Sequence, residues 1–317
     1  MSAPFPSDLT AAPTGGAVAW VFDARGTRNV WIAEPPDYRG RAVTSYAGDD
    51  GQEITDLAYA PDGKSLVYVR GGPPNREGEI PNPTSDPAGS TQAVHAVAVG
   101  GGEPRRLGDG AGQAVSPRGD RIAFVQKDKV WWAKLDRSDK PAQAFQARGS
   151  CGNLRWSADG SRLAFLRIPS SPTAREFLRP HREGPPWSVR VVDMASGQAR
   201  EVFRADAGRG SVFREIVSPD QLVWADGDRI VFPWEKDGWT HLYAVGAGGG
   251  PPALLTPGEF EVEDVRVSPG CRRKCSRRSR IVTSSSPCRA SCAESSASDA
   301  SFSSTSRSAR RRPSPST

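Results

Sequence analysis

The sequence predicts an all-β protein built from repeated antiparallel sheets, on three observations. Gly (33) and Pro (28) are frequent among the 317 residues, which indicates many turns. Nine Trp against two Met favours strands and aromatic packing over a helical bundle. Asp-Gly or a related pair recurs between short runs rich in Val, Ile, Leu, Phe and Tyr, and Gly adopts the positive φ of a hairpin turn without a Cβ clash.

One hairpin pattern accounts for most of these turns. It consists of an apolar pair, a Ser/Ala-Pro/Ala-Asp/Arg-Gly turn, a polar pair and four residues of mostly apolar character. The copies are LAYAPDGKSLVYVR (57–70), QAVSPRGDRIAFVQ (113–126), LRWSADGSRLAFLR (154–167) and the looser LVWADGDRIVFPWE (222–235). A fifth copy, VRVSPG, begins at residue 265 and stops at Gly270. Each copy predicts a strand, a tight turn and a second strand.

A second apolar hairpin accompanies each turn, so that two hairpins make a four-stranded unit. These second hairpins fall at 29–36, 93–107, 129–145, 188–203 and 241–255. A repeat period near 40 residues with loop insertions is typical of a β-propeller blade. We therefore predict an incomplete β-propeller of about five to six four-stranded blades, with a degenerate first blade at 17–34. The Pro-rich insertions at 71–92 and 168–187 are expected to be surface loops at one rim.

The chain divides into three predicted segments: an N-terminal segment (1–16), the propeller (17–270) and a tail (271–317). The tail holds 16 Ser, 10 Arg and one Lys against two acidic residues, a net charge of +9, whereas the remaining 31 basic and 34 acidic residues carry −3. So polar a segment cannot bury enough apolar surface to offset its ordering entropy, and we expect it to be disordered. Because the change falls inside a repeat, we interpret the tail as an out-of-frame translation, with a natural Arg/Ser tail as the alternative.

The sequence also excludes several classes of protein. It has no run of about 18 apolar residues, so we expect no membrane span. The N-terminus lacks the basic start and apolar stretch of a secretory signal, which favours the cytoplasm, or the periplasm or the exterior if the natural start lies upstream. The oligomeric state is not predicted.

Metal and nucleic-acid binding are not favoured either. A four-thiolate zinc site could use the spacing of Cys271, Cys275, Cys288 and Cys292. The segment between them offers little apolar core to fold around a metal, so we interpret the spacing as a chance occurrence. No metal or other cofactor is therefore expected. Cys151 is expected to be a lone thiol. The arginine runs at 272–274 and 310–312 lack aromatic neighbours for base stacking, so no specific nucleic-acid partner is predicted.

Candidate catalytic groups are few. His95 and His241 lie in strand-like runs where packing or a surface position is favoured, and His181 lies in a Pro/Arg-rich loop. Ser211 lies near glycines but lacks the strand–turn–helix context of a nucleophile. No Gly-x-Ser-x-Gly elbow occurs, and no Ser–His–carboxylate set is recognisable. We therefore expect this chain to be inactive by itself.

The repeats, together with FPWEKDGWTHLYAVGAGGGPPALLTPGEFEVEDVRVSP (232–269), resemble the N-terminal propeller of prolyl oligopeptidase-family serine peptidases of the dipeptidyl peptidase IV type. The phrase Asp-Gly-Trp-x-His-Leu-Tyr followed by Leu-Thr-Pro-Gly-Glu is its most specific part. The resemblance implies a propeller that gates peptide access to an α/β-hydrolase domain, which we expect to be missing here. Two alternatives stay open: a free-standing Tol-like propeller that binds a protein, and a propeller hydrolase with a metal in its channel.

Two loops carry candidate substrate-binding residues. The first, NREGEI (75–80), contains Arg76, Glu77 and Glu79. In the family that the chain resembles, glutamates of the propeller hold the amino terminus of the peptide. The loop resembles these glutamates in role but does not match their sequence motif. The second, PWEKDGWTH (233–241), contains Glu235, Asp237 and Trp239, which could line a peptide channel. A solvated loop is the alternative for the first set, and packing between blades is the alternative for the tryptophans.

Overall fold

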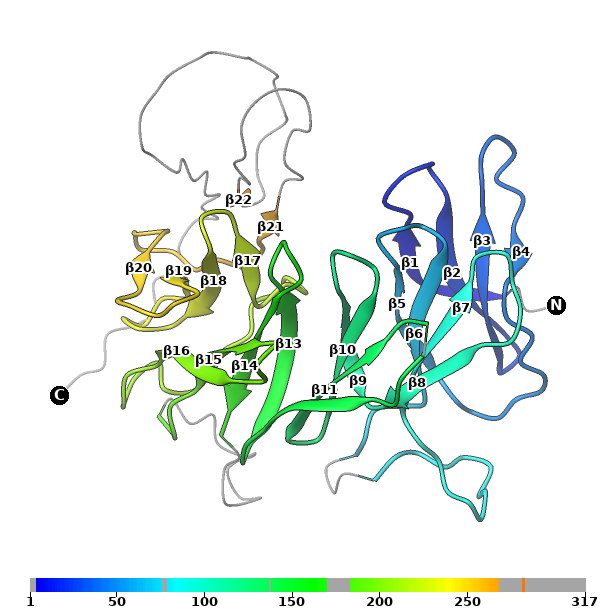
Figure 1. Cartoon of the computed structure of the whole chain (residues 1–317), viewed down its shortest axis with the longest axis horizontal. Coiled ribbons are helices and arrows are strands. Elements are labelled where there is room, and N and C mark those ends of the chain that lie inside the picture. The colour runs from blue at the N-terminus through cyan, green and yellow to red at the C-terminus, as the bar shows by residue number, and fades with distance from the viewer. Residues whose placement is uncertain (1–3, 76–78, 137, 170–182, 268–280, 283–317) are drawn as a thin grey trace. The chain divides into compact units, whose positions relative to one another are not determined.

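The computed structural model describes residues 4–75, 79–136, 138–169, 183–267 and 281–282, of which 266–267 and 281–282 are described by their backbone alone. These residues form strands, turns and loops without a helix, so none of them could cross a membrane as a helical span. The strands make five four-stranded antiparallel sheets, which confirms the predicted all-β fold of propeller blades (Figure 1).

In every four-stranded sheet the strands lie side by side in chain order, as a meander. The first sheet consists of β1 (Phe5–Ala11), β2 (Val18–Ala24), β3 (Thr27–Ala33) and β4 (Arg41–Ala42). The second consists of β5 (Ile54–Tyr59), β6 (Ser65–Arg70), β7 (Ala93–Ala98) and β8 (Arg105–Asp109). The third consists of β9 (Ala111–Val115), β10 (Arg121–Gln126), β11 (Lys129–Lys134) and β12 (Ala142–Gln146).

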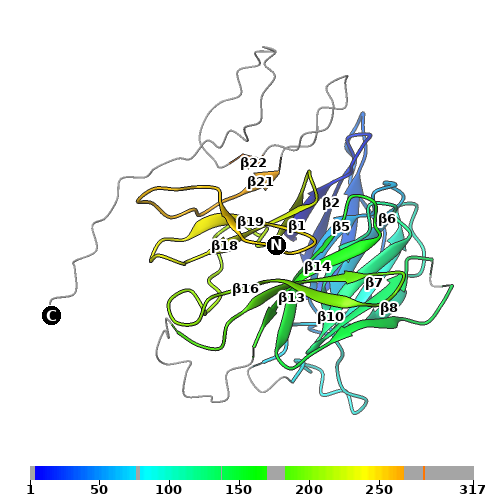
Figure 2. The same ribbon diagram turned by 60° about the vertical axis from the view of Figure 1, so that its left-hand side comes forward.

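The later sheets follow the same order. The fourth consists of β13 (Ser150–Trp156), β14 (Arg162–Ile168), β15 (Ser188–Asp193) and β16 (Ala199–Arg204). The fifth consists of β17 (Val223–Ala225), β18 (Arg229–Trp234), β19 (His241–Gly246) and β20 (Ala253–Leu254), and Figure 2 shows β18 and β19 side by side. A two-stranded pairing joins β21 (Arg266–Val267) to β22 (Ile281–Val282), beyond Gly270.

The chain forms two compact units. The first comprises residues 1–163 and 192–198, and the second comprises 164–191 and 199–317. The division passes through the fourth sheet, whose strands β14 and β15 each belong partly to both units.

The predicted hairpin turns are the local basis of the sheets. At the turn between β5 and β6, the Gly63 N–H donates to the Ala60 carbonyl (2.9 Å), and Gly63 has a φ of 68°, which an L-residue rarely adopts. The equivalent bonds at Gly119 and Gly160 are both 2.8 Å long. The Asp-Gly signal therefore reports a backbone turn that recurs with the same hydrogen bond.

Strand β1 lies inside the segment 1–16 that the sequence analysis separates from the propeller. It pairs antiparallel with β2, as the first strand of the first sheet. The sequence DLTAAPTG (8–15) aligns with DLAYAPDG (56–63), and Gly15 has a positive φ (81°), as the other turn glycines have. This copy does not match the repeat pattern, because Thr14 replaces the turn Asp and the polar pair that follows the turn is absent.

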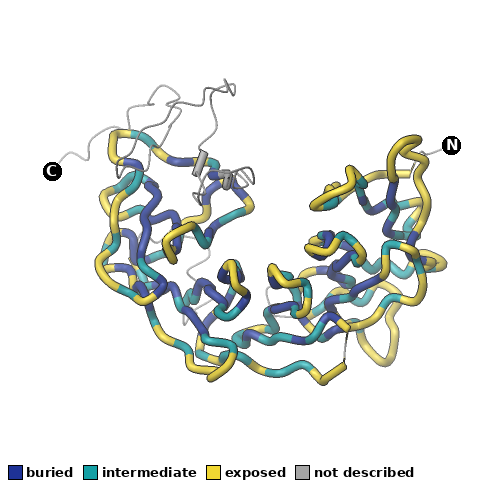
Figure 3. The backbone as a smooth tube through the Cα atoms, turned by 45° about the horizontal axis from the view of Figure 1, so that its top comes forward, coloured by how far each residue is buried: buried dark blue, intermediate teal, exposed yellow. Residues whose placement is uncertain are grey.

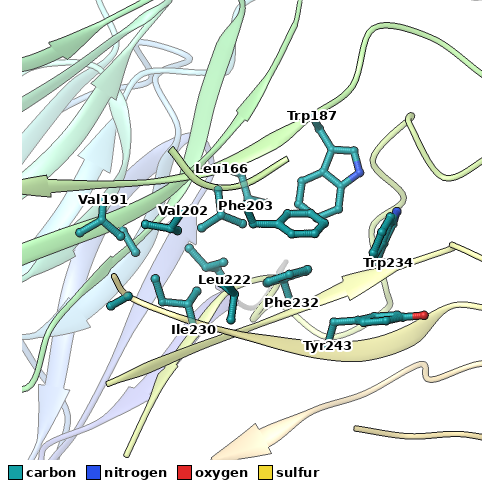
Figure 4. Close-up of a cluster of buried hydrophobic side chains, with 14 of the residues drawn as sticks. Leu166, Trp187, Val191, Val202, Phe203, Leu222, Ile230, Phe232, Trp234 and Tyr243 are labelled. Atoms are coloured by element: carbon teal, nitrogen blue, oxygen red, sulfur yellow. The ribbon is translucent and has the colours of Figure 1, made fainter. Parts of the chain in front are cut away.

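Apolar clusters fill the space between consecutive sheets within each unit, and Figure 3 shows buried stretches of the chain alternating with exposed ones. In the first unit, Val21, Ile32 and Leu66 belong to the cluster between the first and second sheets. In the second unit, the cluster between the fourth and fifth sheets is aromatic at one end and contains Trp187, Phe203, Phe232, Trp234 and Tyr243 (Figure 4). The inner strands, such as β6 and β14, are buried on both faces and are therefore nearly continuous apolar runs.

Candidate functional rim of the second unit

Three connections of the second unit meet at one end of its sheets, and we call them the rim loops: residues 183–187, 205–214 and 235–240. They lead into β15, out of β16 and from β18 to β19. Two contacts join them: the Gly184 N–H donates to Ser211 Oγ (2.8 Å), and Arg214 pairs with Glu235. Loops held by a rigid sheet scaffold are where binding residues commonly lie.

The carbonyl of Gly210 anchors the rim loops. The indole N–H groups of Trp187 and Trp234 both donate to it, at 3.1 and 2.9 Å. Gly210 has a φ of 81°, and a Cβ there would lie 2.4 Å from the Glu235 carbonyl oxygen. Because two buried tryptophans share one acceptor, the loop that bears Gly210 is fixed against the end of β18.

Glu235 directly follows β18 and lies mostly buried in the rim. Its carboxylate forms an ion pair with the guanidinium of Arg214, and the two side chains are 10 and 41% exposed respectively. An arginine–carboxylate pair at such a position retains N–H donors that face solvent. The pair therefore combines a fixed carboxylate with an accessible guanidinium edge.

Asp237 and Trp239 lie in the turn between β18 and β19. The backbone N–H of Trp239 donates to Asp237 Oδ1 (3.2 Å), and Asp237 Oδ2 lies 3.9 Å from Nε2 of His241. His241 is 1% exposed and its ring meets that of Phe260 edge-to-face, with 5.6 Å between centroids. Its Nδ1 is buried without a hydrogen-bond partner among the described residues. Of the three residues predicted in this stretch, Asp237 and Trp239 are joined by a hydrogen bond, whereas Glu235 pairs with Arg214.

The other predicted set lies in the first unit. Arg76 and Glu77 fall outside the described residues. Glu79 is exposed, and its carboxylate and backbone N–H both bond to the side chain of Asn75, at 3.0 and 2.8 Å. Within the described residues, this arrangement closes a small polar loop.

The remaining candidates take structural roles. Ser211 is fully buried. Its hydroxyl accepts the backbone N–H of Gly184, and its carbonyl accepts the backbone N–H of Trp187 (3.2 Å). His95 lies on β7 and stacks on Tyr68, with 5.6 Å between ring centroids, and burial lowers the pKa of His95. Cys151 on β13 is buried, and its thiol donates to the Asp128 carbonyl (3.8 Å). His181 and the four tail cysteines lie outside the described residues.

Sequence analysis missed Arg214, Gly210 and Trp187 as parts of this rim. Arg214 is 21 positions from Glu235, in a loop without a motif, so no local pattern connects them. A signal for Gly210 exists in the string Gly-Arg-Gly-Ser (208–211), because glycines flank positions where the backbone turns or approaches another chain segment closely. The groups gathered at the rim are a carboxylate, a guanidinium and aromatic rings, which suit binding.

Comparisons with known proteins give no family by sequence. No family model matches the chain, and no curated protein matches it. Structural likeness is found instead. A structure from a study of two prolyl endopeptidases has a TM-score of 0.52 at 11% identity, covering 84% of this chain and 38% of that one. A puromycin-hydrolysing peptidase of Mycobacterium tuberculosis has a TM-score of 0.52 at 16% identity, covering 84 and 41%.

Propellers of another kind are also similar. TolB from Acinetobacter baumannii has a TM-score of 0.46 at 13% identity, covering 81% of this chain and 56% of that one. The chain thus spans less than two thirds of the length of each of these three structures. At such identities, the likeness to the two peptidase structures shows a shared fold, the β-propeller.

Proposed function

We propose that this chain is the propeller portion of a serine peptidase of the prolyl oligopeptidase family, of the dipeptidyl peptidase IV type. In that role it would gate the access of short peptides to a hydrolase domain, which would cleave them by acyl transfer through a Ser–His–Asp triad. The propeller itself would contribute binding and exclusion, not chemistry.

The position of the most specific sequence phrase carries this proposal. Asp-Gly-Trp-x-His-Leu-Tyr begins at Asp237 in the turn between β18 and β19 and continues into β19. It therefore joins the rim to the buried strand β19, whose Tyr243 packs in the aromatic cluster. The likeness to two peptidase structures, of which this chain covers 38 and 41%, supports the same assignment.

At the rim, Glu235 and Arg214 are the groups proposed to bind peptide. A carboxylate of low exposure attracts an ammonium or a peptide N–H, and a guanidinium binds carbonyl oxygens or a carboxylate. Trp239, which is half-buried in the turn between β18 and β19, offers a ring face to an apolar side chain. In the intact enzyme these residues would set peptide affinity.

The reading frames of the gene test the assignment. If a shift near codon 270 restores the SPDG repeat and is followed by a hydrolase sequence with Gly-x-Ser-x-Gly, the proposal is supported. If every frame ends without such a domain, the proposal fails and a free-standing protein-binding propeller of the Tol type takes its place.

Kinetics of the restored full-length enzyme test the rim. Glu235→Gln and Arg214→Gln should each raise KM for a short peptide about tenfold with little change in kcat, because each removes a charge-assisted hydrogen bond made in the ground state. The matched control is Glu103→Gln, which changes an exposed carboxylate in the first unit. Unchanged KM in both rim variants would remove these residues from the binding role.

A further inference from the structure

The face of the first sheet that points away from the second sheet carries no charge. Val21 and Ile32 belong to the apolar cluster between the first and second sheets, so their neighbours along β2 and β3 point to the opposite face. The register of the pairing places that face's residues in three cross-strand rows: Pro6, Phe22 and Asn29; Trp20, Trp31 and Ala42; and Ala11, Val18 and Ala33. None of these side chains is charged.

Three partly exposed aromatic rings dominate this face, and we call Leu9, Trp20, Phe22, Trp31 and Ala42 together the aromatic face. Phe22 meets the rings of Trp20 and Trp31 edge-to-face, with 5.4 Å between centroids in both pairs. A Cβ at the residue before Arg41 would lie 3.2 Å from the Trp20 ring, so the loop that leads to β4 lies against this ring. The rings are thus fixed in place and lose little freedom when a partner covers them.

Leu9 marks this face as one that another sheet normally covers. It lies in the β1 bulge, opposite Trp20, and is 77% exposed. The residues at the same distance before the turn glycine in β5 and β13 are Leu57 and Leu154, which are 7 and 1% exposed. Leu57 packs between the first and second sheets. A leucine at this repeat position is therefore buried in the second and fourth sheets but exposed in the first, which none of the described sheets precedes.

Other parts of the chain are poorly suited to cover the aromatic face. In the second unit, the fifth sheet already has its own cover on the face away from the fourth sheet. There Val231 and Leu242 pack with Val262 and Val265, which come from the segment after β20. Residues 271–317 hold 16 Ser and 10 Arg but only one aromatic residue, a composition that supplies no apolar face.

We infer that the aromatic face binds the same face of a second copy of the chain, in a two-fold symmetric dimer. A two-fold contact brings identical patches together, so a charge near its centre would meet a like charge. The aromatic face carries none, and two ion pairs at its border, Arg28 with Asp23 and Arg41 with Glu34, are neutral overall. Two sheets that pack face to face through apolar side chains are a common arrangement. The inference goes beyond the proposed function, because this face lies in the first unit and takes no part in peptide binding at the rim.

The dimensions of the face indicate a weak dimer. Strands β1, β2 and β3 have seven residues each, and with β4 they span about 23 Å by about 15 Å. Taken as flat, this is roughly 350 Å², less than the roughly 800 Å² per partner of a standard interface. Association is therefore expected at micromolar concentrations or above.

Sedimentation velocity of the 317-residue chain, from low micromolar to several hundred micromolar, tests the inference. The runs contain about 0.5 M salt, which screens the charges of the Arg-rich tail. A concentration-dependent shift from monomer to dimer is expected, without larger species. Leu9→Glu and Ala42→Glu, at the two ends of the central row, should each abolish the dimer, because the contact would bury a carboxylate without a partner.

Two further variants are controls. Leu9→Met keeps the apolar contact and should retain the dimer. Val217→Glu changes an 83% exposed apolar residue of the second unit and should also retain it. Because Leu9 and Ala42 are exposed, both glutamate variants should keep the urea midpoint that the parent shows at a concentration where it is monomeric.

Four results would overturn the inference. The first is a parent that remains monomeric throughout the range, and the second is a dimer that survives both glutamate variants. The third is a dimer that Val217→Glu also abolishes, which would indicate non-specific association. The fourth is growth into larger species as the concentration rises, which would indicate a head-to-tail contact between different faces.

Discussion

The side chain of Asp8 accepts the backbone N–H of Asp56, with 3.0 Å between Oδ1 and N. Both residues have positive φ, 52° and 55°, and both lie at β-bulges in the first strands of their sheets. The Asp56 carbonyl in turn accepts an N–H of the Gln113 side chain (2.6 Å), and the adjacent Gly112 occupies the same repeat position in the third sheet with a φ of 60°. The bulge of one sheet is thus linked to the bulge of the next across the first unit.

Removing the first of these links should destabilise the first unit. Asp8→Ala leaves the Asp56 N–H without its acceptor and should lower the free energy of unfolding by about 1 kcal/mol. Asp8→Asn retains an acceptor oxygen and should cost less. Urea unfolding followed by tryptophan fluorescence measures both, with Asp37→Ala, an exposed residue, as control. Equal stability of Asp8→Ala and the parent would show that the link contributes nothing.

The same pair should make stability depend on pH. Desolvation and the charge of Asp8 raise the pKa of Asp56 above its ordinary 3.8. The folded state therefore holds this proton more tightly than the unfolded state, so the associated stability is present at low pH and is lost as pH rises through the raised value. Asp8→Asn removes part of that loss. The urea midpoint of Asp8→Asn minus that of the parent should therefore increase between about pH 3 and pH 7. A difference that stays constant over this range would contradict the prediction.

Two glycines in one rim loop offer a matched test of the anchor. Gly208 and Gly210 have nearly the same φ, 85° and 81°, but only at Gly210 would a Cβ meet a neighbour, the Glu235 carbonyl. Gly208→Ala should cost about 1–2 kcal/mol from left-handed backbone strain alone. Gly210→Ala should cost at least twice as much, because the loop must also move away from β18. Urea midpoints and the near-ultraviolet circular dichroism of the tryptophans measure the difference, and similar costs would argue against the anchor.

Ser211 should matter for stability. Ser211→Ala leaves the Gly184 N–H without its partner and should lower the free energy of unfolding by about 1–3 kcal/mol. Ser45→Ala, at an exposed position, should have little effect. In the restored full-length enzyme, kcat of Ser211→Ala should equal that of the parent at a temperature where both are folded. Loss of kcat there would return Ser211 to the list of nucleophile candidates.

Much of the fold could be predicted because its signals are local. The turns at Gly63, Gly119, Gly160 and Gly227 are each specified by about four adjacent residues, and the strands that follow them are mostly apolar. The first strand was harder to predict, since Thr14-Gly15 retains the turn glycine but not its usual neighbours. The turn containing Asp237 and Trp239 could likewise be located from the sequence, because its residues are neighbours in the chain.

The sequence alone determined the repeat, its turns and the apolar runs of the inner strands, because these depend on residues that are neighbours in the chain. Only the tertiary structure decided which distant groups meet: Arg214 with Glu235, two indoles on the Gly210 carbonyl, and Asp8 with Asp56. Such pairs depend on how consecutive sheets stack and on where loops of unequal length return. No sequence pattern encodes these distances, since each arises from packing that many side chains determine together.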